Sequence, residues 1–147
     1  MDNHFHLLVE TPAADLDVGM CWLQGCYAQA FNRRHGRTGH LFERRYGASA
    51  LEEDEVVREV ARYVVRNPVT AGLCRHPAAY RWSSYRATTG ARRPPPFLAA
   101  DRTLLLFGRG APARAAFAAY VNADDPAAGA DPAAGLRVGE ESVRRRP

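Results

Sequence analysis

The chain has 147 residues, 46% of them hydrophobic, which suffices for one compact core and leaves too little for two full domains. Its formal net charge is +4, and all 20 basic residues are arginine, the residue best suited to forked contacts with phosphate oxygens. The abundant alanine, glycine, proline and arginine are also typical of a GC-rich coding bias, to which we mostly attribute the absence of lysine.

The cysteines and the N-terminal segment exclude several classes of protein. Three cysteines without paired spacing indicate neither a disulfide framework nor a structural zinc site. The start of the sequence lacks the basic and apolar regions of a signal peptide, and no apolar run approaches membrane-spanning length. We therefore expect a soluble, cytoplasmic protein without a membrane partner.

The first half of the chain predicts a strand, a helix and an extended segment. Residues 4–10 predict a short strand that carries His4 and His6 on one face. Apolar residues then recur at three- and four-residue steps and predict an amphipathic helix that ends near Gly36. Residues 39–51 predict an extended segment, which we interpret as a second strand.

The second half predicts helices and a tail. An acidic run at 52–55 suits the start of a helix, which Asn67-Pro68 should end, because proline disfavours helical geometry in the residue before it. Residues 77–89 predict a turn and a short helix, and apolar residues between 104 and 121 predict one or two more. We expect a domain over residues 1–90, a linker and short helices over 91–122, and a disordered tail over 123–147.

The His4-Phe5-His6 segment places two imidazoles on one face of the predicted strand, roughly 6 to 7 Å apart along the backbone. Side chains at that spacing can converge on one metal ion. The alternative is that one histidine lies in the core and the other is exposed, which is the commoner outcome for an isolated pair of this kind.

Tyr63 and Asn67 are four residues apart, so both lie on one face of the second predicted helix. A tyrosine is a nucleophile once its proton is lost, and an asparagine oxygen can bind a hard cation. Without other information, the commoner interpretation is a core aromatic residue followed by a helix-ending asparagine.

Basic and aromatic residues alternate around the end of the first predicted helix. Arginines bind phosphates and aromatic rings stack on bases, so this segment predicts a single-stranded nucleic-acid surface, with a solvated loop as the alternative. The arginines are Arg33, Arg34, Arg37, Arg44 and Arg45, and the aromatic residues and histidines between them are His35, His40, Phe42 and Tyr46.

Four ordered motifs cover residues 1 to about 90. They are Met1-Asp2-Asn3-His4-Phe5-His6-Leu7-Leu8-Val9, Phe31-Asn32-Arg33-Arg34 with Gly39-His40-Leu41-Phe42, Tyr63 with Asn67-Pro68-Val69 and Ala71-Gly72-Leu73, and Trp82-Ser83-Ser84-Tyr85. In this order they resemble the REP-associated tyrosine transposases and their insertion-sequence relatives, the single-tyrosine members of the HUH superfamily.

The resemblance implies a transposase that cuts and rejoins single-stranded DNA, often hairpin-bearing, through a 5′-phosphotyrosine intermediate. It implies that Tyr63 is the nucleophile and that His4, His6 and Asn67 hold a divalent metal, Mg²⁺ or Mn²⁺; the histidine pair alone would equally suggest zinc. The implied fold is α+β, with a ferredoxin-like antiparallel sheet packed against helices.

Relatives of this kind have a strand, a helix and another strand before the histidine motif, whereas here the motif begins at position 1. We therefore expect an N-terminally truncated domain with an incomplete sheet, which strands from a second copy could complete in a homodimer. Two rival functions stay open, a catalytically inactive DNA-binding remnant and a small metallohydrolase that uses His4 and His6 with water as the nucleophile.

Overall fold

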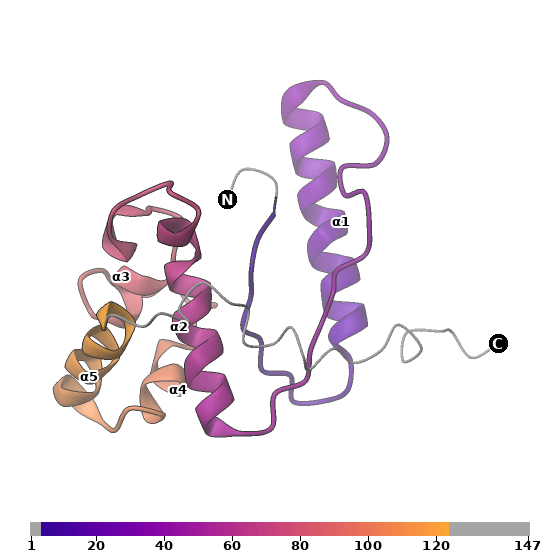
Figure 1. Cartoon of the computed structure of the whole chain (residues 1–147). Coiled ribbons are helices and arrows are strands. Elements are labelled where there is room, and N and C mark those ends of the chain that lie inside the picture. The colour runs from indigo at the N-terminus through magenta and orange to yellow at the C-terminus, as the bar shows by residue number, and fades with distance from the viewer. Residues whose placement is uncertain (1–3, 124–147) are drawn as a thin grey trace. The chain divides into compact units, whose positions relative to one another are not determined.

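The structure is a computed structural model that describes residues 4–123, in which helices are joined by irregular segments (Figure 1). Their elements, in chain order, are α1 (Leu16–His35), α2 (Asp54–Thr70), the 3-10 helix η1 (Pro77–Ala79), α3 (Tyr85–Thr88), α4 (Ala100–Leu105) and α5 (Gly110–Asn122). The chain divides into two compact units. Among the described residues, unit 1 comprises 4–8 and 51–123, and unit 2 comprises 9–50.

The expected ferredoxin-like sheet is wrong for the described residues. Neither 4–10 nor 39–51 forms a strand, and only Ser49 has an isolated bridge pairing. A strand is held by hydrogen bonds to a neighbouring strand, and an alternating pattern alone supplies none of them. Without such a ladder, residues 4–8 run as an irregular segment beside α2 in unit 1 (Figure 1).

The first predicted helix is confirmed as α1, and its end is built as expected. Gly36 has a φ of 59°, a left-handed conformation that glycine adopts without steric cost. The N–H of Arg37 donates to the carbonyl of Asn32 at 2.9 Å, and the side-chain amide of Asn32 donates to the carbonyl of Gly39 at 2.9 Å. These bonds hold the turn that follows α1.

The apolar stripe predicted for α1 is only partly covered. Met20 is buried, Phe31 is half-buried, and Leu23 and Tyr27 are exposed. The spacing therefore predicted the helix correctly, whereas burial of the whole stripe would have required the sheet that the described residues lack.

Helix α2 runs three residues beyond the expected stop at Asn67. Pro68 lies in the last turn, where its missing N–H removes a single helical hydrogen bond. The helix ends at Thr70, and the turn after it is closed at Gly72, with a φ of 71°, where the N–H groups of Gly72 and Leu73 donate to the carbonyls of Val69 and Pro68 at 2.9 Å each. This paired arrangement is a Schellman motif. Asn67 is therefore inside the helix.

The core of unit 1 joins α2 to the helices that follow it. Phe117 is the largest side chain that is fully buried, at 1% exposure, and its ring meets those of Tyr85 and Phe107 with centres 6.1 and 5.4 Å apart. The short helices expected near Tyr85 and between residues 104 and 121 are confirmed as α3, α4 and α5. The buried cluster consists of Val65, Tyr85, Leu104, Ala113, Phe117 and Val121.

Two arginines of α2 cap the end of α5. Arg62, 4% exposed, donates from Nη2 to the carbonyl of Ala123 at 2.8 Å, and Arg66 donates from Nη1 to the carbonyl of Val121 at 2.7 Å. The last carbonyls of a helix lack intrahelical partners and carry partial negative charge, so a guanidinium both satisfies and neutralises them. The two helices are thereby joined by polar bonds as well as by apolar packing.

A second polar contact joins the same helices. The hydroxyl of Tyr120 donates to the Glu59 carboxylate, and the guanidinium of Arg62 lies over the Tyr120 ring at 5.3 Å. Burial, followed by the bond to Glu59, raises the pKa of Tyr120 to about 12. The phenol therefore stays protonated at neutral pH and continues to donate.

The expected tail at 123–147 lies outside the described residues, apart from Ala123. Within residues 4–123, every helix is too short or too polar to traverse a bilayer.

Replacement of Phe117 by alanine should lower the free energy of unfolding by about 3–5 kcal/mol, because it empties the centre of the core. Phe97→Ala is the matched control: Phe97 is 88% exposed, and its loss should change stability by no more than about 0.5 kcal/mol. Urea unfolding followed by circular dichroism measures both. Equal losses for the two variants would contradict the assigned core.

Candidate functional site

Three rings of unit 1 form a continuous cluster. The imidazole rings of His4 and His6 are perpendicular, and their centres are 5.1 Å apart. The His6 ring also packs in a T-shaped arrangement against the Tyr63 ring, with the two centres 5.2 Å apart. The segment 4–8 supplies both histidines, and the middle of α2 supplies the tyrosine. The structure thus brings together three of the residues singled out in the sequence, although no strand carries the histidines.

The separation of the two imidazoles fits shared binding of one ion. A ring nitrogen about 2.1 Å from a metal places its ring centre about 3.2 Å away, and two such ligands at roughly 90–110° place their centres about 4.5–5.2 Å apart. The centres of His4 and His6 are 5.1 Å apart. Within residues 4–123, no group of three or more histidine, cysteine, aspartate or glutamate side chains could hold a metal, so a third protein ligand for such an ion would have to be of another type.

Asn67 is the side chain that the sequence suggests for that ligand. It is half-buried on α2, one turn after Tyr63, and the continuation of the helix through Thr70 keeps the two residues on one side of it. An amide oxygen is an acceptable ligand for a hard cation.

The cluster is open to a substrate but shielded in part. His4 is exposed, and His6 and Tyr63 are half-buried, while the Nε2 atom of His6 is shielded from solvent. A phenol in this position can meet a strand from solvent, and the buried imidazole nitrogen lies in surroundings where electrostatic interactions are stronger than in water.

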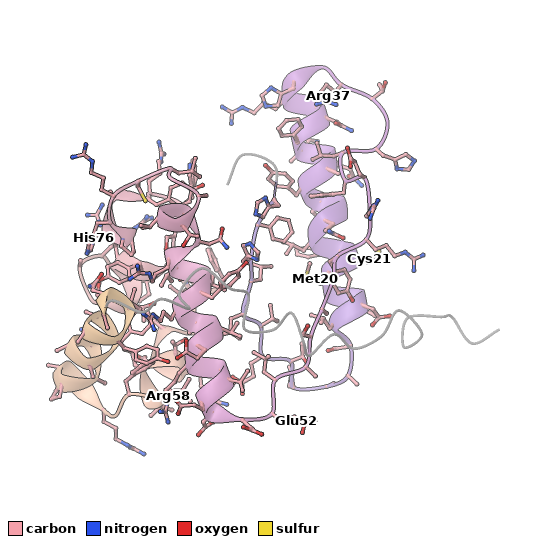
Figure 2. All side chains as sticks on the ribbon, viewed as in Figure 1. Met20, Cys21, Arg37, Glu52, Arg58 and His76 are labelled. Atoms are coloured by element: carbon pink, nitrogen blue, oxygen red, sulfur yellow. The ribbon has the colours of Figure 1, made fainter. Side chains whose placement is uncertain are left out.

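The five predicted DNA-binding arginines all lie exposed in unit 2. Arg33 and Arg34 occupy the last turn of α1, Arg37 follows Gly36, and Arg44 and Arg45 lie in the irregular segment after it (Figure 2 labels Arg37). Their solvated guanidinium groups are available for phosphate oxygens.

Aromatic rings accompany these arginines. The Phe31 ring lies between those of Tyr27 and His35, with centres 6.1 and 4.3 Å away, and the Phe42 ring lies 6.1 Å from Tyr27. The guanidinium of Arg37 is 5.9 Å from the centre of the Phe31 ring. We call this set of side chains the arginine–aromatic surface; it combines phosphate-binding and base-stacking groups.

Sequence reasoning missed the arginines of α2 and the residues after its end. Arg62, Arg66, Arg75 and His76 were not singled out, because their roles depend on α5, which lies about 50 residues further along the chain. The signal that could have found Arg62 and Arg66 is the repeat of arginine at 58, 62 and 66, which places three cations on one side of α2.

Part of the chain is similar to a known protein family. Residues 1–67 match a family model described as "Transposase IS200 like". The match is to transposases. It covers His4, His6 and Tyr63, the arginine–aromatic surface, and ends at Asn67. No curated protein and no solved structure matches the chain.

The similarity supports a transposase-like function for the matched region and, with it, DNA as the partner. The ring cluster lies in unit 1, and the arginine–aromatic surface lies in unit 2.

Replacement of the five surface arginines by glutamine should weaken binding to single-stranded DNA and flatten its dependence on salt. Each lost phosphate contact on a single strand removes about 0.7 from the slope of log affinity against log salt. Fluorescence anisotropy over a salt series measures affinity and slope together.

The control exchanges three arginines of unit 1 that lie outside this surface, Arg86, Arg92 and Arg102, for glutamine. The control has less charge removed, so the comparison is made per arginine. An equal loss per arginine in both sets would show that net charge, and not the arginine–aromatic surface, governs binding.

Proposed function

We propose that this protein cleaves and rejoins single-stranded DNA through a covalent intermediate on Tyr63, with a divalent metal, Mg²⁺ or Mn²⁺, held by His4, His6 and Asn67. The observation that carries the proposal is the ring cluster of His4, His6 and Tyr63 inside a region similar to IS200-like transposases. A nucleophile beside two metal-binding side chains is the arrangement that phosphoryl transfer needs.

In the proposed reaction, the Tyr63 oxygen loses its proton and attacks the scissile phosphorus. A bond forms between that oxygen and phosphorus, and the bond from phosphorus to the 3′-oxygen breaks. The departing 3′-oxygen takes up a proton and becomes a hydroxyl, while the 5′-phosphate stays on Tyr63. One phosphodiester replaces another, so the 3′-hydroxyl can later attack the link, expel the tyrosine oxygen and rejoin strands.

A bound divalent cation would polarise a non-bridging phosphate oxygen and stabilise the negative charge that develops during attack. Held by the two imidazoles and the Asn67 oxygen, such a cation would keep positions for phosphate oxygens and water. His6 also packs against the Tyr63 ring and so restricts its orientation.

The arginine–aromatic surface would hold the strand. Its guanidinium groups neutralise phosphates without reading sequence, and its rings stack on unpaired bases. Single-stranded DNA with a hairpin is the substrate that the sequence motifs imply.

Tyr63→Phe should abolish the covalent protein–DNA adduct, since a phenyl ring keeps the packing against His6 but has no oxygen to attack. We expect the rate of adduct formation to fall by at least about 10³-fold. The measurement is a denaturing gel of the full chain with labelled, hairpin-bearing single strands and Mn²⁺. Tyr80→Phe, which removes a phenol of unit 1 outside the cluster, should leave the adduct intact.

The outcomes separate the rival functions. Cleavage without an adduct, unchanged in Tyr63→Phe, would identify a metallohydrolase that uses water. DNA binding by the unaltered chain without cleavage or adduct would identify an inactive binding remnant.

The metal site predicts that the full chain binds Mn²⁺ through its histidine pair. His6→Ala should lower the affinity for Mn²⁺ by at least about tenfold, because one of two imidazole ligands is lost. The free-ion signal in electron paramagnetic resonance reports the binding directly and without catalysis. His40→Ala removes an isolated, exposed histidine and should have no effect; an equal loss in that variant would mean that Mn²⁺ binds non-specifically.

A further inference from the structure

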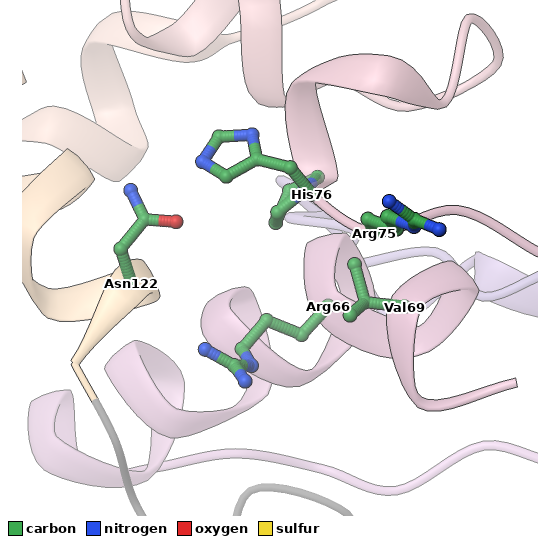
Figure 3. A pocket seen from close by; sticks show the side chains of 6 residues that line it. Arg66, Val69, Arg75, His76 and Asn122 are labelled. Carbon is green, nitrogen blue, oxygen red and sulfur yellow. The ribbon is translucent and has the colours of Figure 1, made fainter. Parts of the chain in front are cut away.

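A cavity of about 390 Å³ lies in unit 1 where the end of α2, the start of η1 and the end of α5 meet (Figure 3). Its volume is within the range of roughly 300–1,000 Å³ that is usual for ligand sites. No carboxylate is among the side chains that line it, which are Arg66, Val69, Arg75, His76, Pro77 and Asn122.

His76 presents a hydrogen-bond donor to this cavity. Its Nδ1 accepts a bond of 3.1 Å from the N–H of Ala78 and so caps η1, which requires Nδ1 to be unprotonated. The ring proton is therefore on Nε2. Figure 3 shows the side chains of His76, Asn122 and Arg66 around one space, with His76 and Arg66 at its opposite ends.

Arg66 supplies a positive charge, and only part of its guanidinium is used in hydrogen bonds within the protein. One guanidinium nitrogen, Nη1, is bonded to the carbonyl of Val121, whereas the buried Nε has no hydrogen-bond partner among the described residues. No carboxylate of residues 4–123 pairs with this guanidinium, which faces the cavity in Figure 3. A guanidinium that no carboxylate pairs with, at the edge of a cavity, favours an anionic occupant.

The remaining polar groups distinguish a nucleotide from a bare anion. The amide nitrogen of Asn122 donates to the Tyr85 hydroxyl at 2.9 Å and to the carbonyl of Ala118 at 2.8 Å, so its oxygen is left to face the cavity. That oxygen is an acceptor, which suits the N–H groups of a base and repels a free phosphate. The guanidinium of Arg75 points away from the space in Figure 3 and adds positive charge at the rim.

The geometry points to a second DNA contact in this cavity: Arg66 and the Nε2–H of His76 bind a backbone phosphate of a single strand, and Asn122 accepts from the adjoining nucleotide. We call it the phosphate cavity. It rests on the proposed function for the identity of the strand, but its residues are distinct from the ring cluster.

The position of the cavity on α2 suits the same strand that reaches Tyr63. Arg66 follows Tyr63 by three residues, which is about 4.5 Å along the helix axis. Arg75, His76 and Asn122 are exposed, so the cavity is open enough for a continuous chain to enter and leave. A phosphate bound here would add a DNA contact on the helix that carries Tyr63.

The test uses two substitutions at one position. His76→Asn and His76→Asp both keep an oxygen that can accept from the N–H of Ala78, so both preserve the cap of η1. Only the aspartate places a negative charge at the cavity. Binding of the full chain to a labelled single strand is measured by fluorescence anisotropy in EDTA, where no covalent capture occurs.

We expect His76→Asn to weaken binding about threefold and His76→Asp about tenfold or more, with the salt slope reduced by about 0.7. Ala116→Asp, which introduces the same charge on the exposed side of α5, should change affinity less than about twofold. Equal effects of His76→Asp and Ala116→Asp would overturn the proposal. If His76→Asp fails to fold, Arg75→Gln tests the proposal instead, because it removes a positive charge from an exposed side chain at the rim of the cavity. Unchanged affinity of Arg75→Gln for single-stranded DNA would contradict the proposed contact.

Inorganic phosphate separates a DNA site from a free-anion site. If phosphate binds in a His76-dependent manner while DNA affinity does not depend on His76, the cavity is a small-anion site and the proposal is wrong. Failure of the proposed chemistry is seen elsewhere, as the absence of a Tyr63 adduct, and leaves the His76 comparison interpretable.

Discussion

The capping of α5 by two arginines of α2 is the contact on which unit 1 depends. Arg62 and Arg66 donate to the carbonyls of Ala123 and Val121 at the point where a helix has no partners of its own. Apolar packing of Val65 against Phe117 and Val121 joins the same two helices. Removal of Arg66 would leave the carbonyl of the buried Val121 without this partner, which costs more than the bond itself contributes.

Because of this packing, different sides of α2 contact different parts of unit 1. The side that bears Arg62, Val65 and Arg66 is occupied by α5, so the side that bears Tyr63 is left for the histidine segment. Held by its core, α2 supplies a rigid support for Tyr63, and positioning of a nucleophile to within a fraction of an ångström matters greatly for rate. The phosphate cavity lies on the same support.

The proposed DNA contacts are of two physical kinds. The arginine–aromatic surface of unit 2 offers exposed guanidinium groups, whose interaction with phosphates is screened by salt. The phosphate cavity instead offers donors held in place by His76 and Arg66, each fixed by a bond to the backbone. We expect the first to attract strands generally and the second to orient one phosphate.

The amino-acid sequence by itself determined the helices and the members of the ring cluster. Three- and four-residue spacing predicted α1 and α2, because helix formation depends on contacts within one turn, and His4, His6 and Tyr63 could be chosen by type and order. The sheet could not be predicted, because alternation in residues 4–10 says nothing about a pairing partner. Only the tertiary structure decided that Arg66, His76 and Asn122 line one cavity. Asn122 is far from the other two in the sequence, and the packing of α5 on α2 brings it to them.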